Sequence, residues 1–337
     1  KTFDTKRIMQ SKIFPLAVLF VLIVIVFSIW AAMKSKYYFA IPTLATILNS
    51  MTVPGFLAVG ASFLMITGNM DLSAASIGAF GGVFSAAAII YWNMPWGVAV
   101  LLSIVVCAAF GLFNAFLINE FGFQPFIATM AMSSVIKGLM TLVSVRGEAA
   151  STILLPENPV YNFFLQIGQG SLKLSPTISI PYNVFLLIAV FVIYGIILSK
   201  TKFGMKMYLV GGNPAAARLV GVNPKKMFYI LFANSAAMGG IAGIINAAKS
   251  NQGSIVALPS DMFTGLTAAM LGGISFGGGS GGMGGAFLGL MITRAFAQGM
   301  NTVNANVYWT TVFSGVLLLI ALTLDYFNQR LKIKGAM

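Results

Sequence analysis

The chain has 337 residues, of which 58% are apolar and only 8% are charged, and its mean hydropathy is +0.91. About a quarter of the residues of a soluble domain are charged, so this composition cannot cover a water-facing surface, and it is too apolar for a disordered chain. One cysteine, Cys107, and no histidine exclude a disulfide scaffold and an ordinary zinc site. We therefore expect an all-α integral membrane protein.

Ten apolar runs are predicted to form membrane-spanning helices, since about 20 residues cross a bilayer. In chain order they lie at residues 14–33, 44–67, 72–90, 97–118, 126–145, 182–198, 228–248, 262–274, 284–299 and 307–325. The eighth is short and runs into the segment Gly272–Gly285, where nine of fourteen residues are glycine, so a broken or short Gly-rich helix is expected there. The polar stretch 146–181 is the longest candidate external loop. Residues 1–337 are expected to form a single transmembrane domain.

Basic residues gather in three segments, which hold 13 of the 20 lysines and arginines. They precede the first apolar run, fill a loop at 199–227 that has no acidic residue, and close the chain. Lysine and arginine beside membrane-spanning helices are retained in the cytoplasm, so the orientation is predicted to be N-in and C-in, with this loop cytoplasmic. Six spans before the loop and four after it agree with that orientation. No soluble domain exists to carry a basic face, which excludes a nucleic-acid partner.

Enzyme chemistry is almost excluded by the residues that are missing. A phosphate-binding loop needs a lysine followed by serine or threonine, and no lysine lies between Lys249 and Lys332, so the glycine cluster cannot be one. A Ser-His-Asp triad is impossible without histidine. The seven acidic residues lie mostly in loops or at the tails. The sequence thus predicts no catalytic residue, no metal site and no cofactor bound by this chain.

Polar residues within or beside apolar runs are candidates for a translocation pathway, because ionisable groups in a membrane are costly and often functional. The candidates are Asn69, Asp71, Asn114, Asn246, Gln252, Thr264 and Arg294. Asp71 has an alternative structural role at the start of the third helix, with Ser73. Two other classes of function stay open at this point: a secondary transporter with Asp71 and Arg294 in an ion-coupled site, and a non-transporting membrane anchor.

The basic loop contains a short helix with its own start and stop signals. Asn213 suits the N-cap, Pro214 suits the first helical position, and Gly221 can end the helix in the left-handed conformation. A capped helix outside the membrane, without a soluble domain around it, indicates docking to another protein. The alternative is an interfacial helix that lies on anionic membrane lipid.

Four segments resemble a known family of transport proteins. They are 66–73 (ITGNMDLS), 111–117 with 124–129 (GLFNAFL and QPFIAT), 211–222 (GGNP through ARL to GV), and 271–275 (LGGIS) with the glycines that follow. Together, and in this order, they are similar to the permease subunit of bacterial ABC importers of the ribose, galactose and xylose type. The chain departs from that pattern at Asn69, where glycine is usual, and at Thr264, where aspartate is frequent.

The resemblance implies a subunit of an ATP-driven importer for a monosaccharide or similar small polyhydroxylated solute, in the bacterial cytoplasmic (inner) membrane. The implied partners are a second permease chain, separate ABC ATPase subunits that hold ATP and Mg, and an extracytoplasmic solute-binding protein. The loop at 199–227 would carry the coupling helix that docks on the ATPase, through Gly211, Gly212, Asn213, Pro214, Ala217, Arg218, Leu219 and Gly221. Related permeases carry nucleosides, autoinducer sugars or branched-chain amino acids, so those solutes remain alternatives.

Overall fold

A computed structural model describes residues 14–144, 152–154, 159–175 and 178–334. Thirteen helices occupy most of these residues: α2 (Phe14–Met33), α3 (Ile41–Ile66), α4 (Ala74–Ile90), α5 (Trp96–Phe121), α6 (Pro125–Ser144), α7 (Pro159–Gln169), α8 (Tyr182–Lys200), α9 (Lys202–Gly212), α10 (Pro214–Leu219), α11 (Pro224–Ser250), α12 (Pro259–Leu271), α13 (Met283–Thr302) and α14 (Val307–Lys334). Four short strands complete the described part: β1 (Thr152–Leu154), β2 (Ser171–Ser175), β3 (Ile178–Pro181) and β4 (Gln252–Ser254). The expected helical class is confirmed.

Each of the ten predicted runs coincides with one helix of the structure. Six of the described helices are long and apolar enough to cross a membrane, namely α2, α3, α5, α6, α8 and α11. α4 has 17 residues and α12 has 13, so both are shorter than a full span. The short eighth helix is confirmed, since α12 ends just before the glycine-rich loop 272–282. The total of ten spans and the orientation stay predictions.

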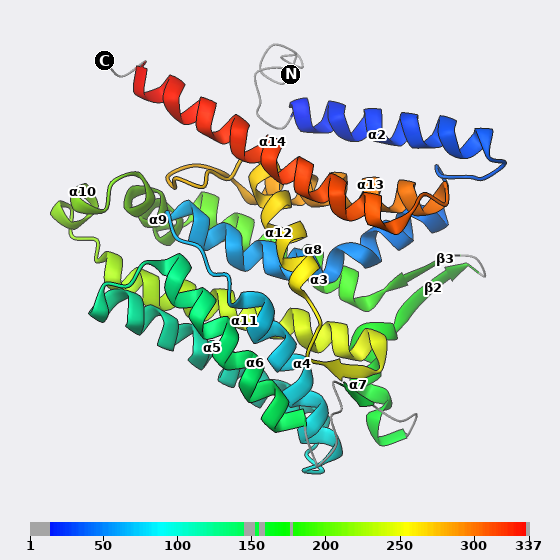
Figure 1. The fold of residues 1–337 in the computed structure, drawn as a ribbon, viewed down its shortest axis with the longest axis horizontal. Coiled ribbons are helices and arrows are strands. Elements are labelled where there is room, and N and C mark those ends of the chain that lie inside the picture. Colours follow the sequence, from blue (N-terminus) through cyan, green and yellow to red (C-terminus); the bar gives the residue numbers. More distant parts are fainter. Residues whose placement is uncertain (1–13, 145–151, 155–158, 176–177, 335–337) are drawn as a thin grey trace.

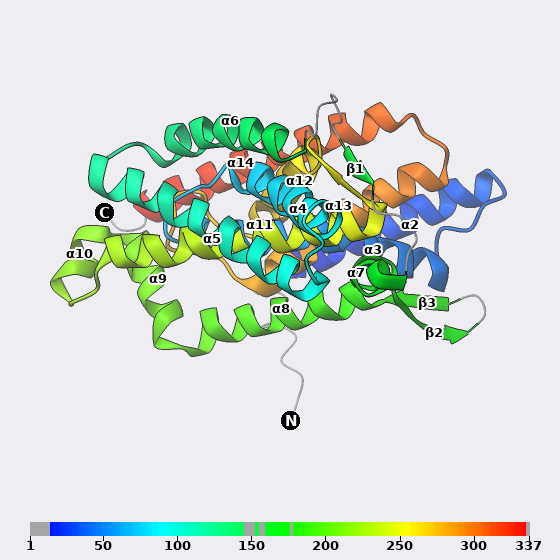
Figure 2. The ribbon, with the colours of Figure 1, turned by 90° about the horizontal axis from the view of Figure 1, so that it is seen from below.

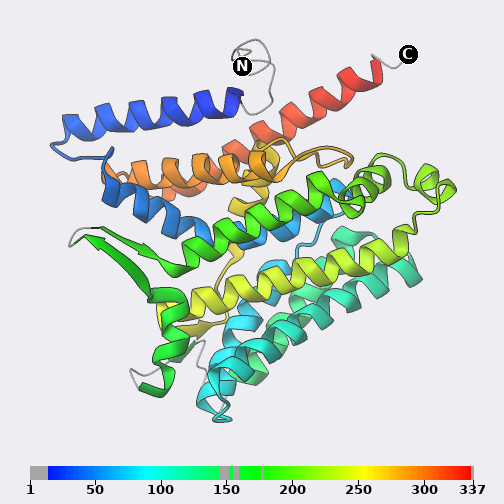
Figure 3. The ribbon, with the colours of Figure 1, turned by 180° about the vertical axis from the view of Figure 1, so that it is seen from behind.

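The basic loop and the polar stretch lie at opposite ends of the helix bundle. α9 and α10 project from one end, whereas α7 and the β2–β3 hairpin lie at the other end (Figures 1 and 3). A single helix, α8, connects them, and one crossing of the bundle places the two segments at opposite ends. The arrangement therefore agrees with the topology expected from the charges.

Within the polar stretch 146–181, the described residues form regular elements rather than a simple external loop. They form α7 and the β2–β3 hairpin, and β1 pairs with β4, which lies almost one hundred residues further along the chain. Gln169, at the end of α7, donates to the carbonyl oxygen of Ala248 at 3.2 Å. The stretch thus covers the end of α11, which local sequence signals did not predict.

α4 and α11 form the centre of the bundle, surrounded by other helices (Figure 2). Fifteen of the 17 residues of α4 are buried, and most of them are Gly, Ala or Ser. A Cβ atom on Gly243 of α11 would overlap the carbonyl oxygen of Gly78 of α4. Small residues let two helix backbones approach closely, which is how helices gain packing energy when the surrounding lipid is as apolar as the side chains. By contrast, only Phe27 and Ala31 of α2 are buried.

We expect Gly243→Val to destabilise the protein by about 3 kcal/mol or more, because the added side chain must push two backbones apart. The measurement is the thermal unfolding of the detergent-purified chain, followed by fluorescence and gel filtration. Gly138→Val on α6 is the matched control, since no atom lies within 4 Å of a Cβ placed there. Equal stability of the two variants would contradict the packing argument.

Candidate functional site

The helix predicted within the basic loop is confirmed as α10. The Oδ1 atom of Asn213 accepts hydrogen bonds from the backbone amides of Ala215 and Ala216, both at 3.0 Å. Gly221, two residues after the helix, has a φ angle of +78°, which glycine adopts at no steric cost. Local sequence alone therefore determines where this helix begins and ends.

α10 presents apolar side chains outward at the tip of the molecule. Leu219 is 89% exposed and Val220 is 67% exposed, and the neighbouring Arg218 is exposed as well. Ala217 faces inward and is buried. Beside the helix lies a cleft of about 390 Å³, lined by Arg218 and the residues 221–225. An exposed apolar tip next to basic side chains is suited to insertion into a groove on another protein.

Gly211 differs from the exposed residues of the predicted coupling set, because it is packed against other parts of the chain. A Cβ atom there would overlap the carbonyl oxygen of Ile66, the last residue of α3. That same carbonyl accepts a hydrogen bond from the amide of Gly279 at 2.8 Å. The end of α9 therefore packs directly on the end of α3 and on the glycine-rich loop 272–282. Gly212 is exposed, and nothing lies within 4 Å of a Cβ placed on it.

Tyr208 adds a side-chain link to this junction. Its hydroxyl donates to the carbonyl oxygen of Gly281 at 2.7 Å. Burial raises the pKa of this hydroxyl above its ordinary value, so the group stays a neutral donor at physiological pH. We call the meeting point of α9, the end of α3 and the loop 272–282 the glycine junction. It connects the segment that carries α10 with the loop between α12 and α13.

Asp71 and Asn114 meet in a buried polar network at the start of α4. The Asp71 carboxylate accepts from the amide of Ser73 at 2.9 Å, from the hydroxyl of Ser73 and from the hydroxyl of Ser235 at 3.2 Å. Asn114 donates to the Ser73 hydroxyl at 2.8 Å. All of these residues are buried, and they come from α11, α5 and the turn before α4. The network fastens that turn to its neighbours.

The structural role considered for Asp71 at the start of α4 therefore fits this conformation, except that Asp71 is not itself the N-cap residue. Asp71 holds the turn before α4, whereas the residue at the N-cap is Ser73. Asn69, two residues earlier, is half-buried and donates to the carbonyl oxygen of Thr67 at 3.2 Å. Ser73 belongs to the motif that sequence analysis singled out, but nothing in the sequence marks Ser235, because it is one small polar residue in a long apolar helix. A pathway role for Asn69, Asp71 and Asn114 stays a prediction.

Thr264 and Arg294 come together in a polar pocket. The pocket has a volume of about 420 Å³ and lies between α12, α13 and α14. Arg294 forms an ion pair with Asp261 of α12. The residues that line it are Ser260, Asp261, Phe263, Thr264, Thr267, Arg294, Ala297, Thr311, Gly315 and Leu318. Asp261 was not among the predicted pathway residues, although it stands three positions before Thr264 and so on the same helix face.

The remaining predicted residues, Asn246 and Gln252, do not line this pocket. Gln252 lies in β4, opposite Leu154 of β1, and Asn246 is half-buried near the end of α11. Between them, Lys249 donates to the backbone carbonyl of Asn49 at 2.8 Å and so ties α11 to α3. A pathway role for Asn246 and Gln252 stays a prediction.

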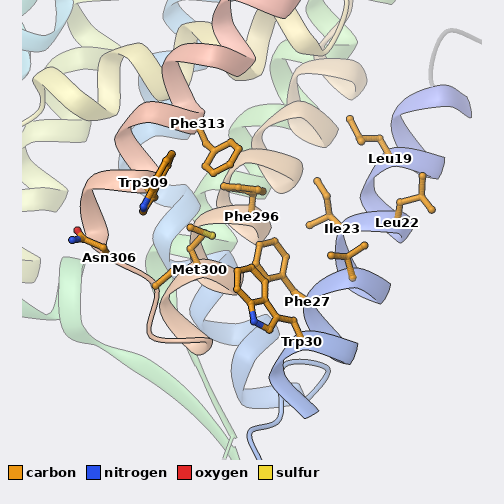
Figure 4. Close-up of a pocket in the computed structure, with 12 residues that line it drawn as sticks. Leu19, Leu22, Ile23, Phe27, Trp30, Phe296, Met300, Asn306, Trp309 and Phe313 are labelled. Atoms are coloured by element: carbon orange, nitrogen blue, oxygen red, sulfur yellow. The ribbon is translucent and has the colours of Figure 1, made fainter. Parts of the chain in front are cut away.

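A larger hollow, of about 710 Å³, is an apolar groove between α2, α13 and α14 (Figure 4). Figure 4 shows Phe27, Phe296 and Phe313 turned toward this groove, with Trp30 and Trp309 nearby. A polar solute would lose its hydrogen bonds to water there without replacement. The groove suits lipid chains, so the polar pocket is the better candidate for a solute.

The structure is thus a bundle of apolar helices with an exposed helix, α10, at one end and a polar pocket among its helices, an arrangement that suits a membrane permease. Residues 43–322 match the family described as "Branched-chain amino acid transport system / permease component". The chain belongs to this family.

Curated relatives cover almost the whole chain. The ribose import permease protein RbsC of Escherichia coli is 29% identical over 327 residues, which cover 97% of each chain. The xylose transport system permease protein XylH of Haemophilus influenzae is 26% identical, covering 93% of this chain and 96% of the relative. The L-arabinose transport system permease protein AraH of Escherichia coli is 30% identical, covering 87% of each. No solved structure matched the chain.

The glycine junction yields a prediction that needs no partner protein. Gly211→Ala forces α9 away from the Ile66 carbonyl, so the amide of Gly279 loses protection from solvent. We expect faster hydrogen exchange throughout the loop 272–282, measured by mass spectrometry on the detergent-purified chain. Gly212→Ala is the neighbouring control and should leave exchange unchanged. Unchanged protection in Gly211→Ala would show that the junction is looser than described.

Proposed function

We propose that this chain is the permease subunit of an ATP-driven importer that moves a monosaccharide into the cytoplasm. The observation that carries the proposal is the near full-length similarity to permeases named for ribose, xylose and arabinose. A polar pocket among the helices supports it, since a sugar needs hydrogen-bonding groups that the apolar groove does not provide. A multi-pass protein of this class belongs in the cytoplasmic (inner) membrane of a bacterium.

ATP hydrolysis belongs to separate ATPase chains in this proposal, and those chains hold ATP and Mg. The present chain carries no cofactor of its own. Each ATPase receives the exposed tip of α10, with Leu219 and Val220 entering a groove and Arg218 meeting acidic groups at its rim. A second permease chain completes the pathway, and an extracytoplasmic solute-binding protein delivers the sugar at the end of the bundle that carries α7 and the β2–β3 hairpin.

The glycine junction supplies the coupling step of the proposed mechanism. A movement imposed on α10 reaches α9 directly, because the two helices are separated only by Asn213. α9 passes the movement to the end of α3 and, through Tyr208, to the loop 272–282. That loop joins α12 to α13, so the helices around the polar pocket shift as rigid bodies. Such shifts of packed helices are a common way to alternate between outward-facing and inward-facing states.

Other solutes within this class are a branched-chain amino acid, which the family description names, a nucleoside and an autoinducer sugar. An ion-coupled transporter with Asp71 and Arg294 in one site has less support. Asp71 is bonded to two serines at the start of α4, whereas Arg294 pairs with Asp261 in the pocket. The two charges thus belong to separate clusters.

Uptake into proteoliposomes tests the proposed function. The chain is reconstituted with its ATPase and its solute-binding protein, and labelled ribose, xylose, arabinose and leucine are offered in turn. We expect ATP-dependent uptake of one of the three sugars, and neither ATP hydrolysis nor uptake by the chain alone. Leucine uptake would move the solute to the amino-acid alternative. Uptake by the chain alone, driven by a proton or sodium gradient, would overturn the ATP-driven reading.

Docking of α10 is tested by introducing negative charge at its tip. We expect Arg218→Glu and Leu219→Asp each to weaken co-purification with the ATPase about ten-fold or more, since contacts at the centre of a small interface dominate its affinity. Lys173→Glu, an exposed charge reversal in β2 at the other end of the bundle, is the control and should bind normally. If both α10 variants bind like the control, the ATPase docks elsewhere.

A further inference from the structure

We propose that the pocket between α12, α13 and α14 is a binding site for the hydroxyl groups of the transported sugar, with Asp261, Arg294 and Thr264 as its recognition residues. This inference rests on the proposed function and adds the location and chemistry of a solute site. It assigns Asp261 a role that sequence patterns did not indicate.

The charged pair is unusual for this chain. Only 8% of its residues are charged, and the other ion pair among the described residues, between Lys225 and Glu120, has side chains that are 51% and 44% exposed. Asp261 and Arg294 are more buried, with side chains that are 26% and 19% exposed. Partly withdrawing two charges from water is unfavourable, and helix packing alone is achieved elsewhere in this protein by glycine and alanine. A charged pair that faces a pocket is therefore better explained by what the pocket binds.

The pocket offers both kinds of hydrogen-bonding partner that a sugar hydroxyl requires. Thr264 donates its hydroxyl hydrogen to the carbonyl of Ser260 at 3.0 Å, and Thr267 donates to the carbonyl of Phe263 at 2.7 Å. Their oxygen lone pairs stay available as acceptors, as do those of the Asp261 carboxylate. The guanidinium of Arg294 supplies donors, and its Nε atom is buried without a partner among the described residues.

Size and position also suit a solute site. A volume of about 420 Å³ falls within the range of small-molecule pockets. Asp261 is in the first turn of α12 and Arg294 is on α13, and the loop that joins these helices is part of the glycine junction. A movement of α12 against α13 changes the spacing of carboxylate and guanidinium. Affinity for the sugar would then differ between two states of the transporter, as import requires.

The first test measures uptake by the reconstituted importer carrying Asp261→Asn. We expect the KM for the transported pentose to rise roughly ten-fold, because hydrogen bonds to charged groups are the strongest ones a sugar can make, with little change in ATPase association. Uptake of mono-deoxy analogues separates recognition from a structural role, because a purely structural defect would leave the discrimination between these analogues unchanged. Wild type should discriminate against a particular deoxy position, and the variant should lose that discrimination.

The double variant Asp261→Asn with Arg294→Gln separates recognition from helix pairing. If the pair only joined α12 to α13, neutralising both partners together would restore uptake, because neither member of the pair is left as an unpaired charge. We expect instead that the double variant keeps the raised KM while its thermal stability returns toward that of wild type. Restored KM would overturn the inference.

Gly315→Leu tests the pocket without touching a charge. Gly315 lines the pocket, and no atom lies within 4 Å of a Cβ placed on it, so a larger side chain begins in open space at the pocket. We expect at least a ten-fold loss of uptake with normal ATPase association. Gly97→Leu, an equally open position at the start of α5, is the control and should transport normally.

The outcomes distinguish this inference from the proposed function. If wild type imports a sugar while Asp261→Asn and Gly315→Leu behave like wild type, the pocket is not a sugar site and the proposed function stands. If the complete wild-type importer moves none of the sugars, the proposed function itself fails.

Discussion

Direct contact between helix backbones at glycine is the interaction on which the rest of this structure depends. In lipid, apolar side chains gain little by moving from solvent to protein, so helices associate through close packing and hydrogen bonds. Gly243 brings α11 against Gly78 of α4, and Gly285 of α13 lies against the carbonyl of Gly272. Gly211 makes the same kind of contact outside the central helices. Backbone contact at glycine therefore holds the helix bundle together and also connects α9 to it.

A contact at glycine has no side chain that could change its rotamer. When one backbone segment moves, the segment packed against it must therefore move as well. α9 touches the backbone of α3 and of the loop 272–282, so these elements must move together or separate. This rigidity gives the proposed coupling route a physical basis. It also explains why Gly211 is needed inside the junction, whereas a side chain on Gly212, one residue later, would extend into open space.

Polar groups are used sparingly, and each cluster has a distinct place. Asp71 is enclosed by serine hydroxyls and an asparagine at the start of α4, where it stabilises a buried turn. Asp261 and Arg294 face a pocket instead. The difference between a carboxylate that is fully bonded within the protein and one that faces a cavity is what directs the proposed sugar site to α12 and α13.

The sequence by itself determined the helical membrane class, the place of the ten apolar runs and the boundaries of α10, because hydropathy, charge and capping are local properties. Only the tertiary structure decided which polar residues meet. Asp261 and Arg294 are 33 positions apart, and Ser235 joins Asp71 across 164 positions. The pairing of β1, which lies within 146–181, with the distant strand β4 could not be predicted from the sequence either. Such pairings depend on how helices pack in three dimensions, and no pattern along the chain records that.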